Sequence, residues 1–105
     1  MLSRIIAAAC VAAFASSGVA QDVAGGYKPP SGYVPDEATA IKIAVAVWEP
    51  IYGADRIARE KPFHATLHDG IWRVTGSLPL HVSGGTAVAE ISKDDGRIIG
   101  VTHGK

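Results

Sequence analysis

The stretch that decides the fold is DEATAIKIAVAVWEPIYG, residues Asp36 to Gly53. Its polar residues Thr39, Lys42 and Glu49 fall on one narrow stripe of a helix, and nearly every other position is apolar. A surface helix needs an apolar arc of about 100° to cover a core, and this arc is much wider. The stretch therefore predicts a helix whose apolar surface exceeds what one flat sheet would cover.

The flanking residues predict where this helix begins and ends. Asp36 can cap the free N–H groups of the first turn, where Glu37 adds a favourable charge. Pro50 is expected to break the hydrogen-bond ladder near the end, and Gly53 to supply a left-handed stop. Residues 54–61 are polar enough for a further short helical turn.

The period then changes from helical to two, which is typical of strands. Segments 63–68 and 71–78 alternate, and Asp69-Gly70 between them is a strong signal for a two-residue hairpin turn. This turn predicts the following pairs: Leu67–Trp72, Ala65–Val74 and Phe63–Gly76 on an apolar face, with Thr66–Arg73 and His64–Thr75 on a polar face.

A second hairpin is predicted from segments 86–92 and 97–103, joined by a turn at residues 93–96. Its apolar residues fall on both faces. Ile91 and Ile98 share one face, and the other carries Val88, Ile99 and Val101.

The predicted fold class is α+β, with one long N-terminal helix packed on a four-stranded antiparallel curved sheet. The single domain is expected to span residues 34–105. Trp48, Tyr52 and Trp72 are expected to pack in its core. The helix should cover a sheet face made by Phe63, Leu67, Trp72, Val74, Ile91 and Ile98.

Residues 1–20 have the pattern of a secretory signal peptide. A positive start at Arg4 precedes an apolar run, residues 5–15, and small residues lead to a cleavage point after Ala20. The run is shorter than the ~20 apolar residues that a membrane span needs. These features predict a periplasmic or secreted protein that has no stable membrane span after cleavage. A lipoprotein acylated at Cys10 is the weaker alternative, because the apolar run before it is too short.

Cleavage would remove Cys10, the only cysteine, so the mature chain would have no disulfide and no thiolate ligand. Residues 21–33 contain Gly25-Gly26 and Pro29-Pro30, which predicts a flexible leader. Removing Arg4 leaves nine basic and ten acidic residues without a basic block. Nucleic acid is therefore not an expected partner.

The four histidines do not predict a metal site. His64 and His68 lie about 13 Å apart on an extended strand, too far to share one ion. His81 falls in a loop and His103 at the end of a strand, with no acidic residue placed to complete a composite site.

Other candidate motifs also have simple structural explanations. Lys93-Asp94-Asp95-Gly96 lacks the spaced acids of a calcium loop, and no helix follows Gly84-Gly85, as a phosphate loop requires. Ser77 and Ser83 are not set in a nucleophile elbow. We therefore predict no catalytic residue, no cofactor and no enzyme activity.

Several motifs together resemble one family. They are Val34-Pro35-Asp36, Trp48-Glu49-Pro50-Ile51-Tyr52-Gly53, Lys61-Pro62-Phe63, Trp72 to Pro79, Gly84-Gly85 and Ile91 to Ile98. In these segments, which span about residues 33 to 104, the chain is similar to bacterial immunity proteins with a nuclear-transport-factor-two (NTF2) fold. The W-x-P-I-Y-G and W-x-V-x-G-x-L-P pieces are the more specific ones.

This resemblance implies a non-enzymatic protein that neutralises the cognate toxin of a polymorphic toxin system by steric occlusion. It also implies a reduced NTF2-like or cystatin-like half-cone, with a helix in the concave side of a curved sheet. Larger proteins of that fold have several helices, whereas this chain has room for one long helix. The surplus apolar surface of the helix could therefore face a partner.

An alternative resemblance is to PepSY-like domains, because residues 89–101 are similar to their final strand–D-x-x-G–strand segment. That reading would imply an envelope protein that regulates or inhibits a peptidase. A periplasmic enzyme or ligand carrier is a third class.

The expected partner is a protein, either a cognate toxin or a peptidase, and the sequence leaves the oligomeric state open. Its expected contact surface combines the polar sheet face with the loop at residues 79–85. The candidate binding residues are His64, Thr66, Arg73, Thr75, His81, Gly84 and Gly85.

Overall fold

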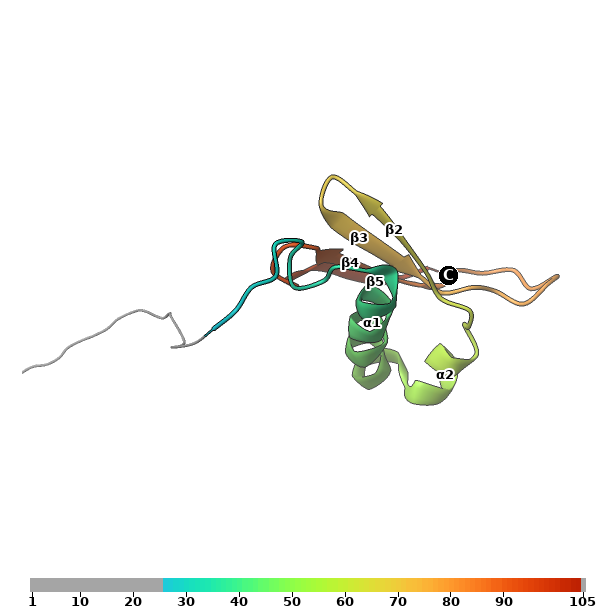
Figure 1. The fold of residues 1–105 in the computed structure, drawn as a ribbon. Helices are drawn as coiled ribbons and strands as arrows, with labels where there is room; N and C mark the ends of the chain where they lie inside the picture. Colours follow the sequence, from blue (N-terminus) through green and yellow to red (C-terminus); the bar gives the residue numbers. More distant parts are fainter. Residues whose placement is uncertain (1–25, 105) are drawn as a thin grey trace, which may run out of the picture.

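Two helices are followed by an antiparallel sheet in this computed structural model, which describes residues 26–104. The helices are α1 (Glu37–Tyr52) and α2 (Ala54–Ala58). The strands are β2 (His64–His68), β3 (Ile71–Thr75), β4 (Ala87–Ser92) and β5 (Ile98–His103), and they lie side by side in the order β2-β3-β4-β5. Both helices lie on the same side of the sheet (Figure 1). The predicted α+β class is confirmed, as is the four-stranded antiparallel sheet.

Helix α1 begins and ends at the predicted residues. A carboxylate oxygen of Asp36 accepts the Thr39 backbone N–H at 2.8 Å. Pro50 has no N–H to donate to the ladder, but the helix continues to Tyr52 and ends at Gly53, which has φ of 96° and donates its N–H to the Glu49 carbonyl at 2.8 Å. A proline this close to the end costs few bonds, and its fixed φ suits a helix. With 16 residues, the predicted long helix is confirmed only in part.

The first hairpin has the predicted register, with His68 opposite Ile71, Leu67 opposite Trp72 and so on to His64 opposite Thr75. Asp69 and Gly70 both have positive φ, at 50° and 78°. Positive φ at both central residues is the geometry of a two-residue type I′ turn, which fixes the register of the strands that it joins. The second strand ends at Thr75, three residues before the predicted end.

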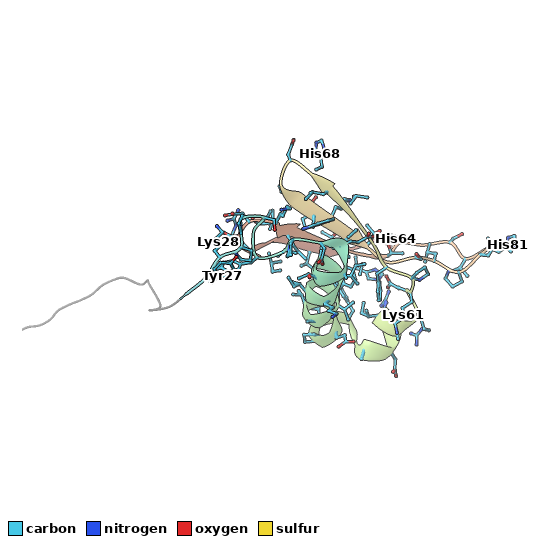
Figure 2. All side chains as sticks on the ribbon, in the orientation of Figure 1. Tyr27, Lys28, Lys61, His64, His68 and His81 are labelled. Atoms are coloured by element: carbon cyan, nitrogen blue, oxygen red, sulfur yellow. The ribbon has the colours of Figure 1, made fainter. Side chains whose placement is uncertain are left out.

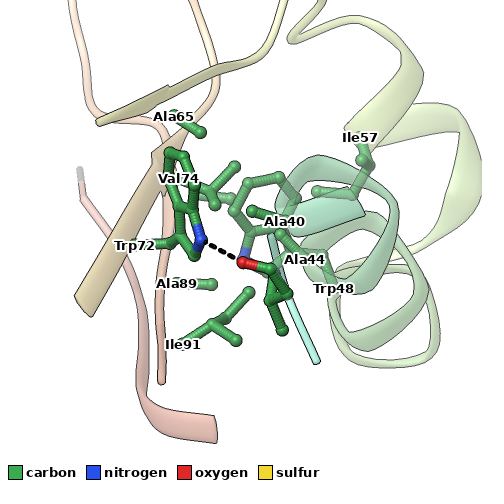
Figure 3. Packing of buried hydrophobic residues seen from close by; sticks show 11 residues of the cluster. Ala40, Ala44, Trp48, Ile57, Ala65, Trp72, Val74, Ala89 and Ile91 are labelled. Atoms are coloured by element: carbon green, nitrogen blue, oxygen red, sulfur yellow. Dashed lines mark hydrogen bonds between the residues drawn. The ribbon is translucent and has the colours of Figure 1, made fainter. Parts of the chain in front are cut away.

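The core lies between α1 and the inner face of the sheet (Figure 3). Helix α1 contributes Ala40, Ala44 and Trp48, all fully buried. Small side chains on both surfaces let the helix approach the sheet closely, and two indole rings fill the remaining space. The buried apolar residues of the sheet are Ala65, Trp72, Val74, Ala87, Ala89 and Ile91.

Two residues that were predicted to be covered by the helix are exposed in the structure. Leu67 is 46% exposed and Ile98 is 38% exposed. Leu67 lies near the turn of the β2–β3 hairpin, which extends beyond α1 (Figure 1). Ile98 begins β5, and α1 packs mainly against β2, β3 and β4. Phe63 is partly buried against Trp48, with their ring centroids 5.7 Å apart.

A β-bulge changes the orientation of the last strand. Ile91 pairs with Ile98 but Glu90 pairs with Gly100, so that Ile99 is the extra residue. Because each extra residue moves the rest of a strand to the other face, Val101 lies on the inner face, opposite Ala89. The prediction that Val101 shares a face with Val88 is therefore wrong.

Part of the predicted leader contacts the domain. Tyr33 donates its N–H to the Asp94 carbonyl at 2.9 Å, and Val34 to the Lys93 carbonyl at 3.0 Å. The Lys28 ammonium lies 2.7 Å from the Asp94 carboxylate. Residues 28–34 are thus attached to the β4–β5 turn, which the sequence did not predict. The first five leader residues, 21–25, and the predicted signal peptide, 1–20, lie outside the described residues.

The end of the leader is also joined to the sheet through Trp72. The indole Nε1 of Trp72 donates a buried hydrogen bond to the Val34 carbonyl at 2.8 Å (Figure 3). Trp48 offers a contrast, because its Nε1 has no hydrogen-bond partner among residues 26–104.

Neither helix of the described residues is long and apolar enough to cross a membrane.

Trp72→Phe should lower the free energy of unfolding by about 1–3 kcal/mol beyond the effect of the smaller ring, because it leaves the buried Val34 carbonyl without a donor. Trp48→Phe is the matched control, since it makes the same change of ring at a fully buried position without losing a bond. Urea denaturation would measure both. Equal losses for the two variants would contradict a stabilising role for the Trp72 bond.

The Asp36 cap should make the protein acid-sensitive. Hydrogen bonds from the Thr39 side chain and backbone hold the pKa of Asp36 below its ordinary value of 3.8. The stabilisation is therefore complete above that ordinary value and is lost as pH falls through the lower, folded pKa. Asp36→Asn keeps a capping oxygen that does not titrate.

The melting temperature of Asp36→Asn should consequently fall less than that of the wild type between neutral pH and about pH 2 to 3. Thermal unfolding followed by circular dichroism at both pH values would measure the difference. The same acid-induced fall in both proteins would show that the Asp36 charge contributes nothing.

Candidate functional site

The polar face predicted from the sequence exists. His64 lies opposite Thr75 and Thr66 opposite Arg73, all on the face of the sheet turned away from the helices. Strand β4 adds Glu90 opposite Arg73, and the Arg73 Nη1 lies 3.1 Å from the Glu90 Oε2. The two side chains are 56% and 39% exposed. No element of residues 26–104 covers this outer face, and its role in binding stays a prediction.

The loop between β3 and β4, residues 76–86, projects from the sheet (Figure 1), and we call it the arm. At its end Val82 donates its N–H to the Pro79 carbonyl at 3.1 Å. His81 lies at the tip (Figure 2) with φ of 68°, a conformation that glycine or asparagine adopts more easily. Leu80 and Val82 are 85% and 50% exposed. The sequence predicted the loop but not its exposed apolar side chains.

The structure does not bring the predicted histidines together. Figure 2 shows His64 and His68 at opposite ends of β2, and His81 distant from both at the tip of the arm. Residues 26–104 contain no group of three or more histidine, cysteine or acidic side chains that could hold a metal ion.

A pocket of about 430 Å³ lies at the base of the arm. It brings together α2, the arm and the end of β5, and it includes the predicted residues Gly84 and Gly85. Its lining residues are Arg56, Arg59, Glu60, Ser77, Leu78, Pro79, Val82, Ser83, Gly84, Gly85, His103 and Gly104.

A buried pair formed by Glu60 and His103 lies in the wall of this pocket. The Glu60 Oε2 is 2.7 Å from the His103 Nε2, and the two side chains are 8% and 10% exposed. The other carboxylate oxygen accepts the Ala87 backbone N–H at 2.8 Å. The His103 ring also packs on Tyr52, with centroids 5.0 Å apart. The pair therefore joins the end of α2 to the first residue of β4 and the last residue of β5.

The His103 ring is held at both of its nitrogens. Its Nδ1 lies 2.7 Å from the Gly104 carbonyl oxygen, and its Nε2 lies 2.7 Å from the Glu60 Oε2. These contacts fix the orientation of the ring in the wall of the pocket.

Glu60 also determines how the arm leaves the sheet. Its backbone carbonyl accepts the Ser77 N–H at 2.7 Å. A Cβ at Gly76 would lie 2.5 Å from the Glu60 Oε1 and 2.8 Å from the Glu60 Cβ, so only glycine fits beside this side chain. Both ends of the arm are thus attached to one buried residue, because the Ala87 N–H follows the arm directly.

Sequence reasoning missed this site. Glu60 belongs to a stretch that reads as a polar helical turn, and His103 is 43 residues away in the chain. His103 lies on the inner face, opposite Ala87, only because of the β-bulge. Nothing in the local pattern indicates that bulge.

The protein is a small α+β domain with surfaces available for binding. Its helices cover one face of the sheet and leave the polar face uncovered, and the arm and the pocket lie beside the sheet. Residues 39–105 match the family model described as NTF2 fold immunity protein. The chain belongs to this family, as its motifs predicted. Membership indicates an immunity-type binding function.

The chain is also 36% identical over 73 residues to the protein named "Uncharacterized protein YhhH" of Escherichia coli (strain K12). The match covers 69% of this chain and 58% of that protein. No solved structure matches the chain.

Glu60→Ala should lower the free energy of unfolding by about 3–5 kcal/mol, because it leaves His103 and the Ala87 N–H without their buried partner. Glu60→Gln should cost clearly less, since the amide oxygen still accepts from Ala87 and the NH₂ group is a hydrogen-bond donor beside the His103 Nε2. Urea denaturation at neutral pH would measure both variants. Equal losses would show that burial of the side chain, and not its hydrogen bonds, stabilises the base of the arm.

Proposed function

We propose that this protein is an exported immunity protein that binds a cognate toxin and neutralises it by covering the surface the toxin needs for its activity. The family match over residues 39–105 supports the immunity function. The observation that carries the steric mechanism is the one-sided packing of the sheet. Both helices cover one face, and the other presents the exposed polar row around Arg73.

In this proposal the sheet has the shape of a reduced half-cone, with α1 in its concave side. The contact surface combines the outer sheet face with the arm. The candidate residues of the face are exposed or partly exposed, and the arm extends well beyond the sheet (Figure 1). A surface of this kind acts through shape and hydrogen bonding, which requires no catalytic residue or cofactor.

Export would place the protein in the compartment where a toxin that attacks the cell wall or membrane acts, so that the two could bind there. The support is the signal-like pattern of residues 1–20. Mass spectrometry of the protein from the periplasm of its host tests this part of the proposal. We expect an N-terminus at Gln21, and an N-terminus at Met1 would overturn export.

The gene beside this one identifies the partner to be tested. An adjacent secreted toxin whose activity disappears when the two purified proteins are mixed would support the proposal. Undiminished toxin activity at saturating amounts of this protein would overturn it. An adjacent peptidase inhibited by this protein would favour the PepSY-like alternative instead.

Arg73→Glu should weaken toxin binding while the fold is retained. The Arg73–Glu90 pair is exposed, and such pairs contribute about 0–1 kcal/mol to stability, so the melting temperature should change little. Arg97→Glu is the matched control, because Arg97 forms a similar exposed pair with Asp95 but lies in the β4–β5 turn. Isothermal titration calorimetry would compare the two. Unchanged affinity for Arg73→Glu would exclude the outer face as a contact surface.

A further inference from the structure

The pocket at the base of the arm carries positive charge. Arg56 of α2 and Arg59, the C-cap residue of that helix, line it, and both residues are exposed. Neither guanidinium lies within 4.0 Å of an acidic side chain among the residues that the structure describes. Glu60 forms no ion pair with either arginine, because its carboxylate oxygens contact the His103 ring and the Ala87 N–H. The described lining therefore has two arginine side chains without an acidic partner.

The arm contributes apolar side chains to the lining of the pocket. Leu78, Pro79 and Val82 line it from the arm, and Leu78 and Val82 are 38% and 50% exposed. Arginine is enriched at protein–protein interfaces and among the residues that contribute most to their affinity, and a bound protein would also cover the apolar side chains beside the two arginines. A purely charged ligand would leave these apolar side chains in water.

The arginines and the apolar side chains together indicate the chemistry of the occupant. A guanidinium binds a carboxylate through two parallel hydrogen bonds, and the bond is strongest where water is excluded. A volume of about 430 Å³ accommodates an acidic side chain together with part of the neighbouring residues of its chain. The described residues have near-balanced charge and no basic stripe, which argues against a polyanion as the occupant.

We propose that this pocket binds an aspartate or glutamate side chain of the toxin, with an adjacent apolar residue of the toxin packed on Leu78 and Val82. This inference rests on the proposed immunity function and names the anchoring contact. The Glu60–His103 pair has a positioning role here. It attaches both ends of the arm, so the apolar side chains stand at a fixed distance from α2.

A peptide experiment tests the pocket without any toxin. The probes are Ac-Gly-Leu-Glu-Leu-Gly-NH₂ and the same peptide with glutamine in place of glutamate, each titrated at millimolar concentration into ¹⁵N-labelled protein. We expect the glutamate peptide to shift the amide signals of Gly84, Gly85 and Gly104, and the glutamine peptide to shift them much less. Equal shifts, or no shifts with either peptide, would overturn the carboxylate assignment.

The full interaction is tested with the purified toxin and the variants Arg56→Glu and Arg59→Glu. Each should weaken binding by about 10- to 100-fold, the loss expected for a charge-assisted bond. Lys42→Glu is the control, because it makes the same change of charge at an exposed position of α1 that does not line the pocket. Circular dichroism confirms that each variant is folded.

The outcomes separate the two proposals. If the wild-type protein does not bind the toxin, the proposed function fails, while the peptide result still decides the chemistry of the pocket. If the wild type binds and both arginine variants bind equally well, the pocket is not the anchor and this inference fails. A change of oligomeric state in the variants, measured by size-exclusion chromatography, would show that a second copy occupies the pocket and would also overturn it.

Discussion

The close contact between the alanine face of α1 and the inner face of the sheet is the constraint on which the structure depends. Ala40 and Ala44 are fully buried in a core to which the sheet contributes Ala87 and Ala89. Small side chains bring the backbones together, and a larger residue at any of these positions would separate the layers. Trp48 and Trp72 then fill the space beside the contact. A short helix can therefore organise a core without disulfides among residues 26–104.

The pocket follows from a second feature, the β-bulge at Glu90 and Ile91. The bulge places Val101 and His103 on the inner face, where His103 meets Glu60 from the end of α2. Glu60 in turn accepts hydrogen bonds at both ends of the arm. One extra residue in an edge strand thus decides where the arm stands and which side chains surround the pocket. The arm projects from a buried, hydrogen-bonded base, although most of its own residues are exposed.

The wide apolar arc of α1 is only partly explained within the chain. Ile43 and Val47, which lie beside the buried stripe, are partly buried, and Ile43 packs on the core. Ile51 at the end of the helix is 56% exposed. Tyr52, on the last turn of α1, packs against the His103 ring. Most of the arc is therefore at least partly buried, and the exposed large apolar residue of α1 is Ile51 on its C-terminal turn.

The sequence by itself determined the features that depend on neighbouring residues. Helix capping at Asp36, the register of the first hairpin and the polar row of His64, Thr66, Arg73 and Thr75 all follow from local turn chemistry and the two-residue period of a strand. Only the tertiary structure decided the bulge, the attachment of the leader to the β4–β5 turn, and the Glu60–His103 pair. The leader contact and the Glu60–His103 pair join residues 43 to 66 positions apart, and their energies depend on packing that no local pattern specifies. The pocket belongs to this second group, since three elements distant in the chain must meet before it exists.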